Sequence, residues 1–252
     1  MQTDFETQAA ATNPLQGRIY ADFSEVEKSI YLQSRLNLCG SAEAIVTLIR
    51  SVEHVTRHAI PGALVECGVW RGGNIEVMVR TLQHLGVRDR DVYLYDTFAG
   101  MPQPDACDDE GLDCASNNRA TWEQHRTEAD GAAGSDWMRA GVDLVRERLD
   151  PLGYPGERLH FVKGLVEDTI PRVMPDRIAI LRLDTDFYRS TKHELMHLYP
   201  RLQRGGILII DDYGAMPGSR RATDEFAAEQ QTGWFLNRVD AHVRLLVKHE
   251  AA

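Results

Sequence analysis

Two pairs of aspartates, each coming directly after an apolar, strand-like run, carry the sharpest chemical signal in this chain. They are Asp184 with Asp186, and Asp211 with Asp212. Neighbouring strand ends in an open α/β sheet meet at one edge, and carboxylates gathered there repel one another unless a hard cation such as Mg²⁺ or Ca²⁺ neutralises them. Acidic residues also end strands for solubility, but two such pairs favour a metal. The pattern predicts Asp184, Asp211 and Asp212 as metal ligands, with Asp186 free to take a proton from a substrate.

A glycine-rich turn between an apolar run and a helical pattern is the second signal. Its spacing, Glu66-x-Gly68-x-x-x-Gly72-Gly73, differs from the G-x-G-x-x-G of dinucleotide dehydrogenases. Glycines let a backbone approach a ligand closely, and a nearby carboxylate can hold the cationic amino-acid part of S-adenosylmethionine. A tight turn without a ligand is the alternative. The residues predicted to bind this cofactor are Glu66, Gly68, Val69, Trp70, Arg71 and Gly72.

Asp96 and Thr97 extend the same hypothesis to the next strand. Asp96 ends the run 92–96, roughly 20 to 30 residues beyond the glycine turn, where an acidic side chain commonly accepts hydrogen bonds from ribose hydroxyls. A strand-end aspartate can instead cap a turn. The glycine turn upstream favours cofactor binding, and we predict that Asp96 and Thr97 contribute to it.

The composition favours a single globular domain that acts on a small molecule. The length of 252 residues fits one large domain, and the formal net charge of −10 argues against a general nucleic-acid binder, which needs lysine and arginine contacts to phosphates. No apolar stretch approaches the roughly 20 residues of a membrane span, and the first residues lack the basic start and apolar centre of a secretory signal. We therefore expect a cytoplasmic protein without nucleic-acid or membrane partners.

The elements that must position these residues alternate between helix and strand patterns. Helical spacing begins at Ser41 and again after the glycine turn. Strand-like runs lie at 63–67, 92–96, 159–162, 178–183 and 207–210, and helical stretches lie near 144–149, 167–173 and 190–202. This alternation favours an α/β fold with a parallel sheet.

Two further segments have a different character. The segments 234–239 and 242–248 predict a C-terminal hairpin around Asp240-Ala241. Residues 97–140, which are rich in proline, glycine and acidic side chains, predict a long loop with room for one helix. Such a loop is a common place for an active-site lid.

Several other candidate residues favour less specific interpretations. The histidine pairs His54 with His58 and His193 with His197 have the i, i+4 spacing of zinc ligands, but exposed helix surface is the better interpretation, because Lys192 and Glu194 lie on the second helix. Arg220 and Arg221 either steer an anionic substrate or lie at a solvated helix start. The four cysteines are expected to be reduced thiols, and the spacing of the last two matches no zinc pattern. They are Cys39, Cys67, Cys107 and Cys114.

Taken together, these motifs resemble the macrocin O-methyltransferase family, whose members methylate sugar hydroxyls on antibiotics and related glycosides. The resemblance spans about residues 40–250 and rests on ordered motifs. These are Pro61-Gly62, Leu64–Gly73, Tyr95–Pro102, Leu181–Tyr188, Tyr199–Gly206 and Ile209–Tyr213.

The resemblance implies a class I methyltransferase, with a mostly parallel seven-stranded sheet, helices on both faces and a C-terminal antiparallel hairpin. It implies S-adenosylmethionine at the first two strand ends, Mg²⁺ at the positions of Asp184, Asp211 and Asp212, and a base at Asp186. Residues 41–252 would form this domain, and residues 1–40 an N-terminal arm or helical cap that helps to shape the acceptor pocket. Apolar clusters in residues 15–35 suggest a homodimer.

The resulting expectation is a Mg²⁺-dependent transfer of a methyl group from S-adenosylmethionine to a sugar hydroxyl of a glycosylated natural product or related saccharide. A catechol-like phenol is the nearest rival acceptor, because a metal chelated by two adjacent oxygens serves both. From another class, Asp184-Thr185-Asp186 resembles the D-x-D site of metal-dependent glycosyltransferases. A non-catalytic S-adenosylmethionine-binding protein is a third possibility, which the retained acidic set disfavours.

Overall fold

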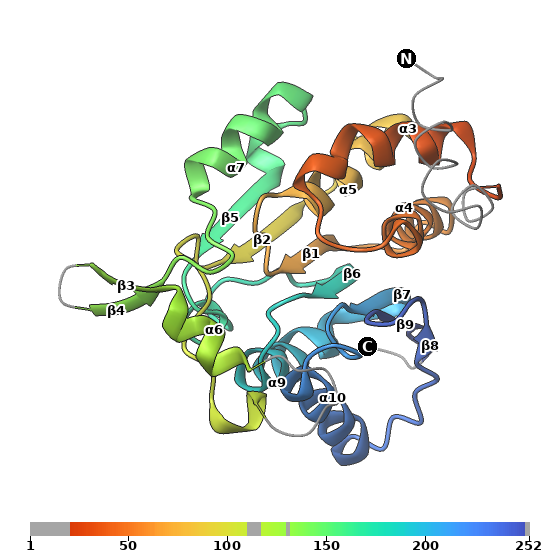
Figure 1. The fold of residues 1–252 in the computed structure, drawn as a ribbon. Coiled ribbons are helices and arrows are strands. Elements are labelled where there is room, and N and C mark those ends of the chain that lie inside the picture. The colour runs from red at the N-terminus through yellow and green to blue at the C-terminus, as the bar shows by residue number, and fades with distance from the viewer. Residues whose placement is uncertain (1–20, 110–116, 130–131, 250–252) are drawn as a thin grey trace.

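The computed structural model describes residues 21–109, 117–129 and 132–249. In this part of the chain, seven strands form one sheet that lies between two groups of helices (Figure 1). The strands, in order across the sheet, are β5 (Leu159–Lys163), β2 (Val92–Asp96), β1 (Ala63–Cys67), β6 (Ile178–Leu183), β7 (Leu202–Ile210), β9 (Arg244–Val247) and β8 (Asn237–Arg238). The first five are parallel, whereas β9 and β8 are each antiparallel to a neighbour. The predicted sheet and its C-terminal hairpin are therefore confirmed, although the hairpin strands are shorter than predicted.

The helices divide between the two faces of the sheet because side chains alternate along each strand. Leu64 of β1 packs in one core cluster with side chains of α4 and α5, and its neighbour Val65 packs in a second cluster with side chains of α9 and α10. Figure 1 shows α4 and α5 on one side of the sheet and α9 and α10 on the other. The helices are α3 (Glu25–Ser34), α4 (Ala42–Arg57), α5 (Gly73–His84), α6 (Asn118–Gln124), α7 (Val142–Leu149), α8 (Val166–Thr169), α9 (Tyr188–Leu198) and α10 (Pro217–Glu229). Within the described residues, none of these combines the length and apolar character of a membrane span.

The described part of the N-terminal segment packs against the start of α5. Helix α3 begins with a capping box between Ser24 and Glu27, which satisfies backbone groups at the helix start. After α3 the chain reaches Asn37, whose carbonyl oxygen would lie 2.3 Å from a Cβ atom at Gly73. Only glycine permits this approach, so the glycine turn also seats the N-terminal segment beside the carboxyl ends of the strands.

The region 97–140 contains more regular structure than the sequence predicts. It holds the expected helix, α6, and in addition an antiparallel hairpin formed by β3 (Arg126–Ala129) and β4 (Ala132–Ser135). The hairpin is anchored at its base, because Gly100 passes so close to Ser135 that a Cβ atom there would lie 2.0 Å from the carbonyl oxygen of Ser135. The prediction of an extended loop was therefore wrong for this part, since short polar strands lack the apolar alternation that signals a strand.

The helix predicted at 167–173 is shorter than expected. Helix α8 ends at Thr169, and Pro171 follows. Proline has no backbone N–H to donate within a helix and its ring collides with the preceding turn, so the helical pattern ends before it.

Candidate active site

The glycine turn after β1 adopts a conformation that few residues other than glycine tolerate. Gly68 has a φ of +85°, and a Cβ atom on it would lie 1.9 Å from the carbonyl oxygen of Asp184 at the end of β6. Gly72 has a φ of +81° and serves as the N-cap of α5. Trp70 also has a positive φ of +45°, which is strained for a residue with a side chain. The turn therefore brings the end of β1 into backbone contact with the end of β6.

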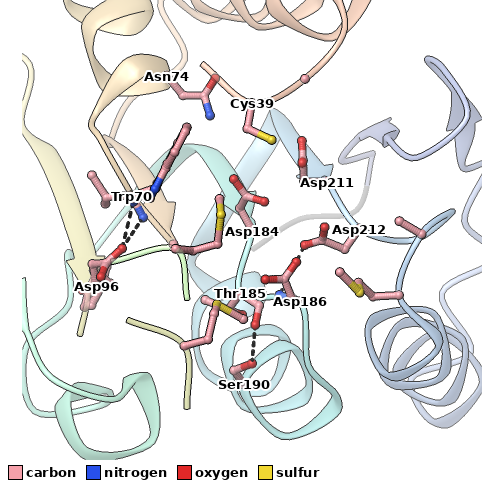
Figure 2. Close-up of a pocket in the computed structure, with 18 of the residues that line it drawn as sticks. Cys39, Trp70, Asn74, Asp96, Asp184, Thr185, Asp186, Ser190, Asp211 and Asp212 are labelled. Carbon is pink, nitrogen blue, oxygen red and sulfur yellow. Dashed lines mark hydrogen bonds between the residues drawn. The ribbon is translucent and has the colours of Figure 1, made fainter. Parts of the chain in front are cut away.

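Asp96 stabilises this turn from the neighbouring strand. Its Oδ2 accepts hydrogen bonds from the backbone amides of Val69 at 2.7 Å and Trp70 at 2.9 Å (Figure 2), and its Oδ1 accepts from the amide of Phe98 at 2.6 Å. Burial raises the pKa of this carboxyl, whereas the amide hydrogen bonds lower it. Asp96 thus caps the turn, which was the alternative to cofactor binding, and its contact with a ribose stays a prediction.

The four aspartates predicted from the sequence lie together at the carboxyl ends of β6 and β7 (Figure 2). Carboxylate oxygens of Asp184, Asp186 and Asp212 lie within 4.8 Å of one another. Asp186 has a φ of +67°, and its backbone N–H donates to Oδ2 of Asp212 at 3.3 Å. Asp211 continues the strand pairing, since its N–H donates to the carbonyl of Leu183 at 2.9 Å. The structure therefore brings together Asp184, Asp212 and the predicted base Asp186, whereas the predicted ligand Asp211 is not part of this compact group.

Burial and neighbouring carboxylates raise the pKa values of three of these aspartates. Burial raises the pKa of Asp184 and Asp212 well above the ordinary value, and charged neighbouring carboxylates raise both further. Burial and the charge of Asp184 raise the pKa of Asp186 to about 7. Crowded carboxylates of this kind are the oxygen donors that hard divalent cations prefer. The donor set therefore fits Mg²⁺.

Arg182 neutralises part of this charge from within the sheet. It lies opposite Glu66 in the β1–β6 register and is only 4% exposed. Its guanidinium donates to Glu66 Oε1 at 2.8 Å, to Asp184 Oδ2 at 2.5 Å and to Asp211 Oδ1 at 2.5 Å. Two of the predicted metal ligands, Asp184 and Asp211, thus each give one oxygen to the same arginine.

A cavity of about 570 Å³ joins the glycine turn to the aspartates. Nine of the twelve predicted site residues line it, and these are Gly68, Val69, Trp70, Asp96, Thr97, Asp184, Asp186, Asp211 and Asp212. The other three do not line it. Glu66 is fully buried behind the wall, Gly72 caps α5, and the Arg71 guanidinium lies 4.8 Å from the ring centroid of Trp70.

Asn74, on the first turn of α5, is a lining residue that the sequence did not single out. Its Oδ1 is buried and accepts no hydrogen bond, and the same is true of Oε2 of Glu66. Unpaired buried acceptors are costly, because they have lost their hydration without gaining a partner. A cationic ligand group such as an α-ammonium would satisfy the Asn74 acceptor.

Other lining residues come from segments that the sequence could not assign to the site. The N-terminal segment contributes Asn37, Cys39, Gly40 and Ser41, and the region 97–140 contributes Met101, Pro102, Trp137 and Met138. The turn between β8 and β9 contributes Asp240 to Val243, and Met216 precedes α10. The cavity therefore has an acidic side and an apolar side built from sulfur-containing and aromatic side chains.

The helix α9 was wrongly expected to be exposed surface. Glu194 is fully buried, and its Oε1 accepts a hydrogen bond from Thr185, which lies between two of the site aspartates, at 3.0 Å. Burial raises the pKa of Glu194 well above its usual range. His193 is half-buried and contacts the carbonyl of Ile170 at 3.0 Å, and Lys192 pairs with Glu229 at 2.8 Å.

The histidine pair of α4 does not line the cavity, whereas Cys39 lies beside the aspartates (Figure 2). His54 contacts the carbonyl of Gly205 at 3.0 Å, and Nδ1 of His58 contacts the carbonyl of His54. Cys39, Cys67 and Cys107 have free thiols, and Cys114 lies outside the described residues. Of the three, only Cys39 lines the cavity.

The sheet order and the position of the site at the carboxyl ends of its strands are those of a class I methyltransferase. A family model of macrocin O-methyltransferases (TylF) matches residues 37–246. The chain therefore belongs to the macrocin O-methyltransferase family, as the sequence motifs predicted.

Named relatives agree with this membership. A demethyldecarbamoylnovobiocin O-methyltransferase from Streptomyces niveus is 35% identical over 71% of this chain, and a mycinamicin III 3″-O-methyltransferase from Micromonospora griseorubida is 32% identical over 81%. These alignments cover 63% and 72% of the respective relatives. A tetracenomycin-type rhamnosyl 4′-O-methyltransferase from Streptomyces olivaceus is 35% identical over 69% of this chain and 61% of its own length.

Solved structures give the same fold. The O-methyltransferase NovP superposes with a TM-score of 0.71 and 29% identity, covering 83% of this chain and 81% of its own. The calicheamicin methyltransferase CalS11 superposes with a TM-score of 0.58 and 19% identity, covering 90% and 93%. At 19% identity, the similarity to CalS11 shows a shared fold and nothing more.

Replacement of Arg182 by methionine tests the buried ion network. Removal of one partner of a buried ion pair commonly costs about 3–5 kcal/mol, because the remaining charges stay buried without compensation. We expect the free energy of unfolding of Arg182→Met, measured by urea denaturation at pH 8, to fall by about that amount. Protonation of the carboxylates should reduce the loss at pH 5, whereas an equal loss at both pH values would contradict the electrostatic explanation.

Glu66 offers a test of how burial affects stability as the pH changes. Burial raises the pKa of Glu66 from 4.5 to about 7, so the folded protein holds a proton that the unfolded chain releases. The contribution of Glu66 to stability is therefore greatest below pH 4.5 and is lost as the pH rises to about 7, by about 3 kcal/mol. Denaturant melts in EDTA between pH 5 and 8 should show a shallower decline for Glu66→Gln. Parallel declines would show that Glu66 ionises normally.

Proposed function

We propose that this protein is a Mg²⁺-dependent O-methyltransferase that moves a methyl group from S-adenosylmethionine to a hydroxyl of a sugar moiety in a glycosylated natural product or related saccharide. One observation carries the proposal. A single cavity has a glycine turn and an unpaired acceptor at one end and convergent aspartates at the other. Such a cavity can hold a cationic methyl donor next to an acceptor whose hydroxyl needs activation.

The donor end consists of the glycine turn, Asn74, and the end of β2. Gly68 holds the turn against the backbone of Asp184, and we assign the unpaired oxygen of Asn74 to the α-ammonium group of the donor. Asp96 and Thr97 line the cavity beside the end of β2, and we assign the ribose of the donor to them. Glu66 lies behind the wall, where its Oε1 accepts a hydrogen bond from Arg182 and holds that guanidinium in place.

The metal end consists of Asp184, Asp211 and Asp212, which we propose as the residues that hold Mg²⁺. Each lines the cavity, and burial together with the neighbouring carboxylates raises the pKa of Asp184 and Asp212, which a bound cation would offset. When bound, Mg²⁺ would stabilise negative charge that develops on an acceptor oxygen.

Asp186 is the residue that we propose as the base. It lines the same cavity, and burial raises its pKa to about 7, which suits a proton acceptor near neutral pH. In the reaction, the acceptor oxygen forms a bond to the methyl carbon while the bond from that carbon to the donor sulfur breaks. The hydroxyl proton passes to the Asp186 carboxylate, and the products are a methyl ether and S-adenosylhomocysteine.

The acceptor class follows from the relatives and from the shape of the cavity. The names of two relatives specify a 3″-O and a rhamnosyl 4′-O position, which are sugar hydroxyls. Vicinal hydroxyls would face the aspartates, and the apolar side around Met101, Trp137 and Met216 would pack against a less polar part of the acceptor. A catechol-like phenol places two adjacent oxygens in the same way and is the second candidate.

The decisive experiment is a methyl-transfer assay with S-adenosylmethionine over a panel of glycosides and catechols, with Mg²⁺ or with EDTA. We expect methylated glycoside only with Mg²⁺, together with calorimetric binding of S-adenosylhomocysteine. Thermal stabilisation by Mg²⁺ should disappear in Asp212→Asn. Methylation that survives EDTA, or a preference for catechols, would contradict the metal or the acceptor assignment respectively.

The role of Asp186 is tested by its replacement with asparagine, which keeps the shape but cannot take a proton. General-base assistance contributes typically about 10²- to 10⁴-fold, so turnover of Asp186→Asn should fall by that factor. Calorimetry should show unchanged binding of S-adenosylhomocysteine, because Asp186 lies at the metal end. If turnover stayed at the parent level, another group would have to accept the proton.

A further inference from the structure

The turn that carries the proposed base has an uncommon backbone conformation. It spans residues 184–188, leads from β6 into α9, and has a φ of +67° at Asp186. A left-handed conformation is uncommon for a residue other than glycine, and it persists where the surrounding structure imposes it. We call residues 184–188 the base turn. The contacts that impose its shape also set the direction of the Asp186 carboxylate.

Backbone N–H groups hold both ends of the base turn. The N–H of Asp184 donates to the carbonyl of Cys67, the last residue of β1, at 2.8 Å. The N–H of Tyr188 donates to Oδ1 of Asp108 at 2.7 Å, and Asp108 is itself buried. These contacts fix where the base turn begins and ends, and its middle is held in a different way.

A side chain from α9 holds the middle of the base turn. The hydroxyl of Thr185 donates to Oε1 of Glu194 at 3.0 Å, and the carbonyl of Thr185 accepts from the hydroxyl of Ser190 at 3.4 Å (Figure 2). Thr185 directly precedes Asp186, so its contact with Glu194 constrains the residue next to the proposed base. Glu194 does not line the cavity. It would therefore act on the reaction through Thr185.

A carboxyl group is a costly choice at position 194. Glu194 is fully buried, its Oε2 accepts no hydrogen bond, and no residue in the described part of the chain forms an ion pair with it. Burial raises the pKa of Glu194 well above its ordinary value, and the charges of Glu167 and Asp212 raise it further. Its neighbours in the core, Leu195 and Leu198, are apolar. A leucine at position 194 would bury no polar group, so stability does not explain the carboxyl group.

Glu194 also lies close to the end of β1. Burial raises the pKa of the Cys67 thiol well above its ordinary value, and the neighbouring Glu194 raises it further. Cys67 packs in the same core cluster as Leu195 of α9, and Gly68 of the glycine turn follows it. Glu194 therefore lies where the end of β1 meets the base turn, beside the backbone that carries the donor side of the cavity.

We propose that Glu194 is a positioning residue for methyl transfer, which holds the base turn through the Thr185 hydroxyl so that the Asp186 carboxylate faces the acceptor hydroxyl. The inference rests on the proposed function and adds to it a residue outside the cavity. A misplacement of about 1 Å caused by a distant substitution can slow a reaction about 10²-fold, which is the scale of the effect. The interaction that matters is the hydrogen bond that Oε1 accepts, and an amide oxygen can accept it as well.

Glu194→Leu separates a positioning role from a structural one. We expect its kcat to fall roughly 10- to 100-fold with little change in KM, because the base is misplaced while the groups that bind the acceptor remain. The midpoint of its urea denaturation should stay the same or rise, because a buried polar group has been removed. Glu194→Gln keeps the acceptor oxygen and should recover most of the turnover with the pH profile of the parent protein. An unchanged kcat or a lower midpoint in Glu194→Leu would overturn the proposal, as would equally slow Leu and Gln variants.

Glu27→Leu is the matched control, because Glu27 is also a buried acid but lies on α3 and pairs with Arg50 at 2.6 Å. It should lower the midpoint of urea denaturation and leave kcat unchanged, which is the opposite pattern. An equal loss of kcat in the two leucine variants would overturn the proposal. Thr185→Val completes a double-mutant cycle, in which the double variant should lose no more turnover than Glu194→Leu alone. Additive losses would show that Thr185 and Glu194 do not act as a pair.

A structural comparison separates this inference from the proposed function. Crystal structures of the parent protein and of Glu194→Leu are compared at the base turn, and we expect Asp186 to leave its left-handed conformation in the variant. An unchanged base turn would refute the positioning role and leave the proposed function standing. A base turn that moves in the variant, in a protein that methylates no glycoside or catechol, would refute the proposed function and support Glu194 as the residue that holds the turn.

Discussion

The buried guanidinium of Arg182 is the interaction on which the rest of the site depends. It lies within hydrogen-bonding distance of Glu66, Asp184 and Asp211, which belong to or directly follow three adjacent strands of the sheet. Buried carboxylates without a counter-charge would cost several kcal/mol each or would take up protons. A single arginine allows the three strand ends to stay close together before any ligand arrives.

This arrangement connects the two ends of the cavity. Glu66 lies behind the wall near Asn74 at the donor end, whereas Asp184 and Asp211 lie at the metal end, and all three contact the same guanidinium. A planar guanidinium group can donate hydrogen bonds to several carboxylates at once, and an ammonium group does so less well. A change in the charge of Glu66 at one end therefore affects Asp184 and Asp211 at the other end through their shared contact with Arg182.

The parts of the site that could be predicted from the sequence are those set by short-range patterns. Buried strands, the glycine turn and the aspartates after β6 and β7 are all signalled by residues that are close in sequence, and the sheet aligns their ends. Arg182 was missed because it lies within an apolar run, and only the register that places it opposite Glu66 reveals its partner. A lone charge in such a run, between acidic strand ends, is the signal that could have identified it.

Residues that depend on long-range packing could not be predicted in the same way. Glu194 looks like helix surface in the sequence, but α9 turns it inward to Thr185. The N-terminal segment and the β3–β4 region carry no motif, and their place beside the cavity follows from close contacts at Gly73 and Gly100. Residues of the N-terminal segment and of the region 97–140 line the cavity. The sequence therefore predicts the aspartates of the cavity better than it predicts the rest of the lining.

The backbone contact between Gly68 and Asp184 explains why the two ends of the cavity can act together. Methyl transfer in line requires the donor carbon and the acceptor oxygen to approach to about 3–3.5 Å, and small misplacements are costly. Because a Cβ atom at position 68 would lie 1.9 Å from the carbonyl oxygen of Asp184, any other residue there would push β1 and β6 apart at their ends. The donor turn and the metal-side strand would move with them. Gly68 therefore sets the distance between the two ends of the cavity. If the strands were pushed apart, no side chain at either end could restore that distance.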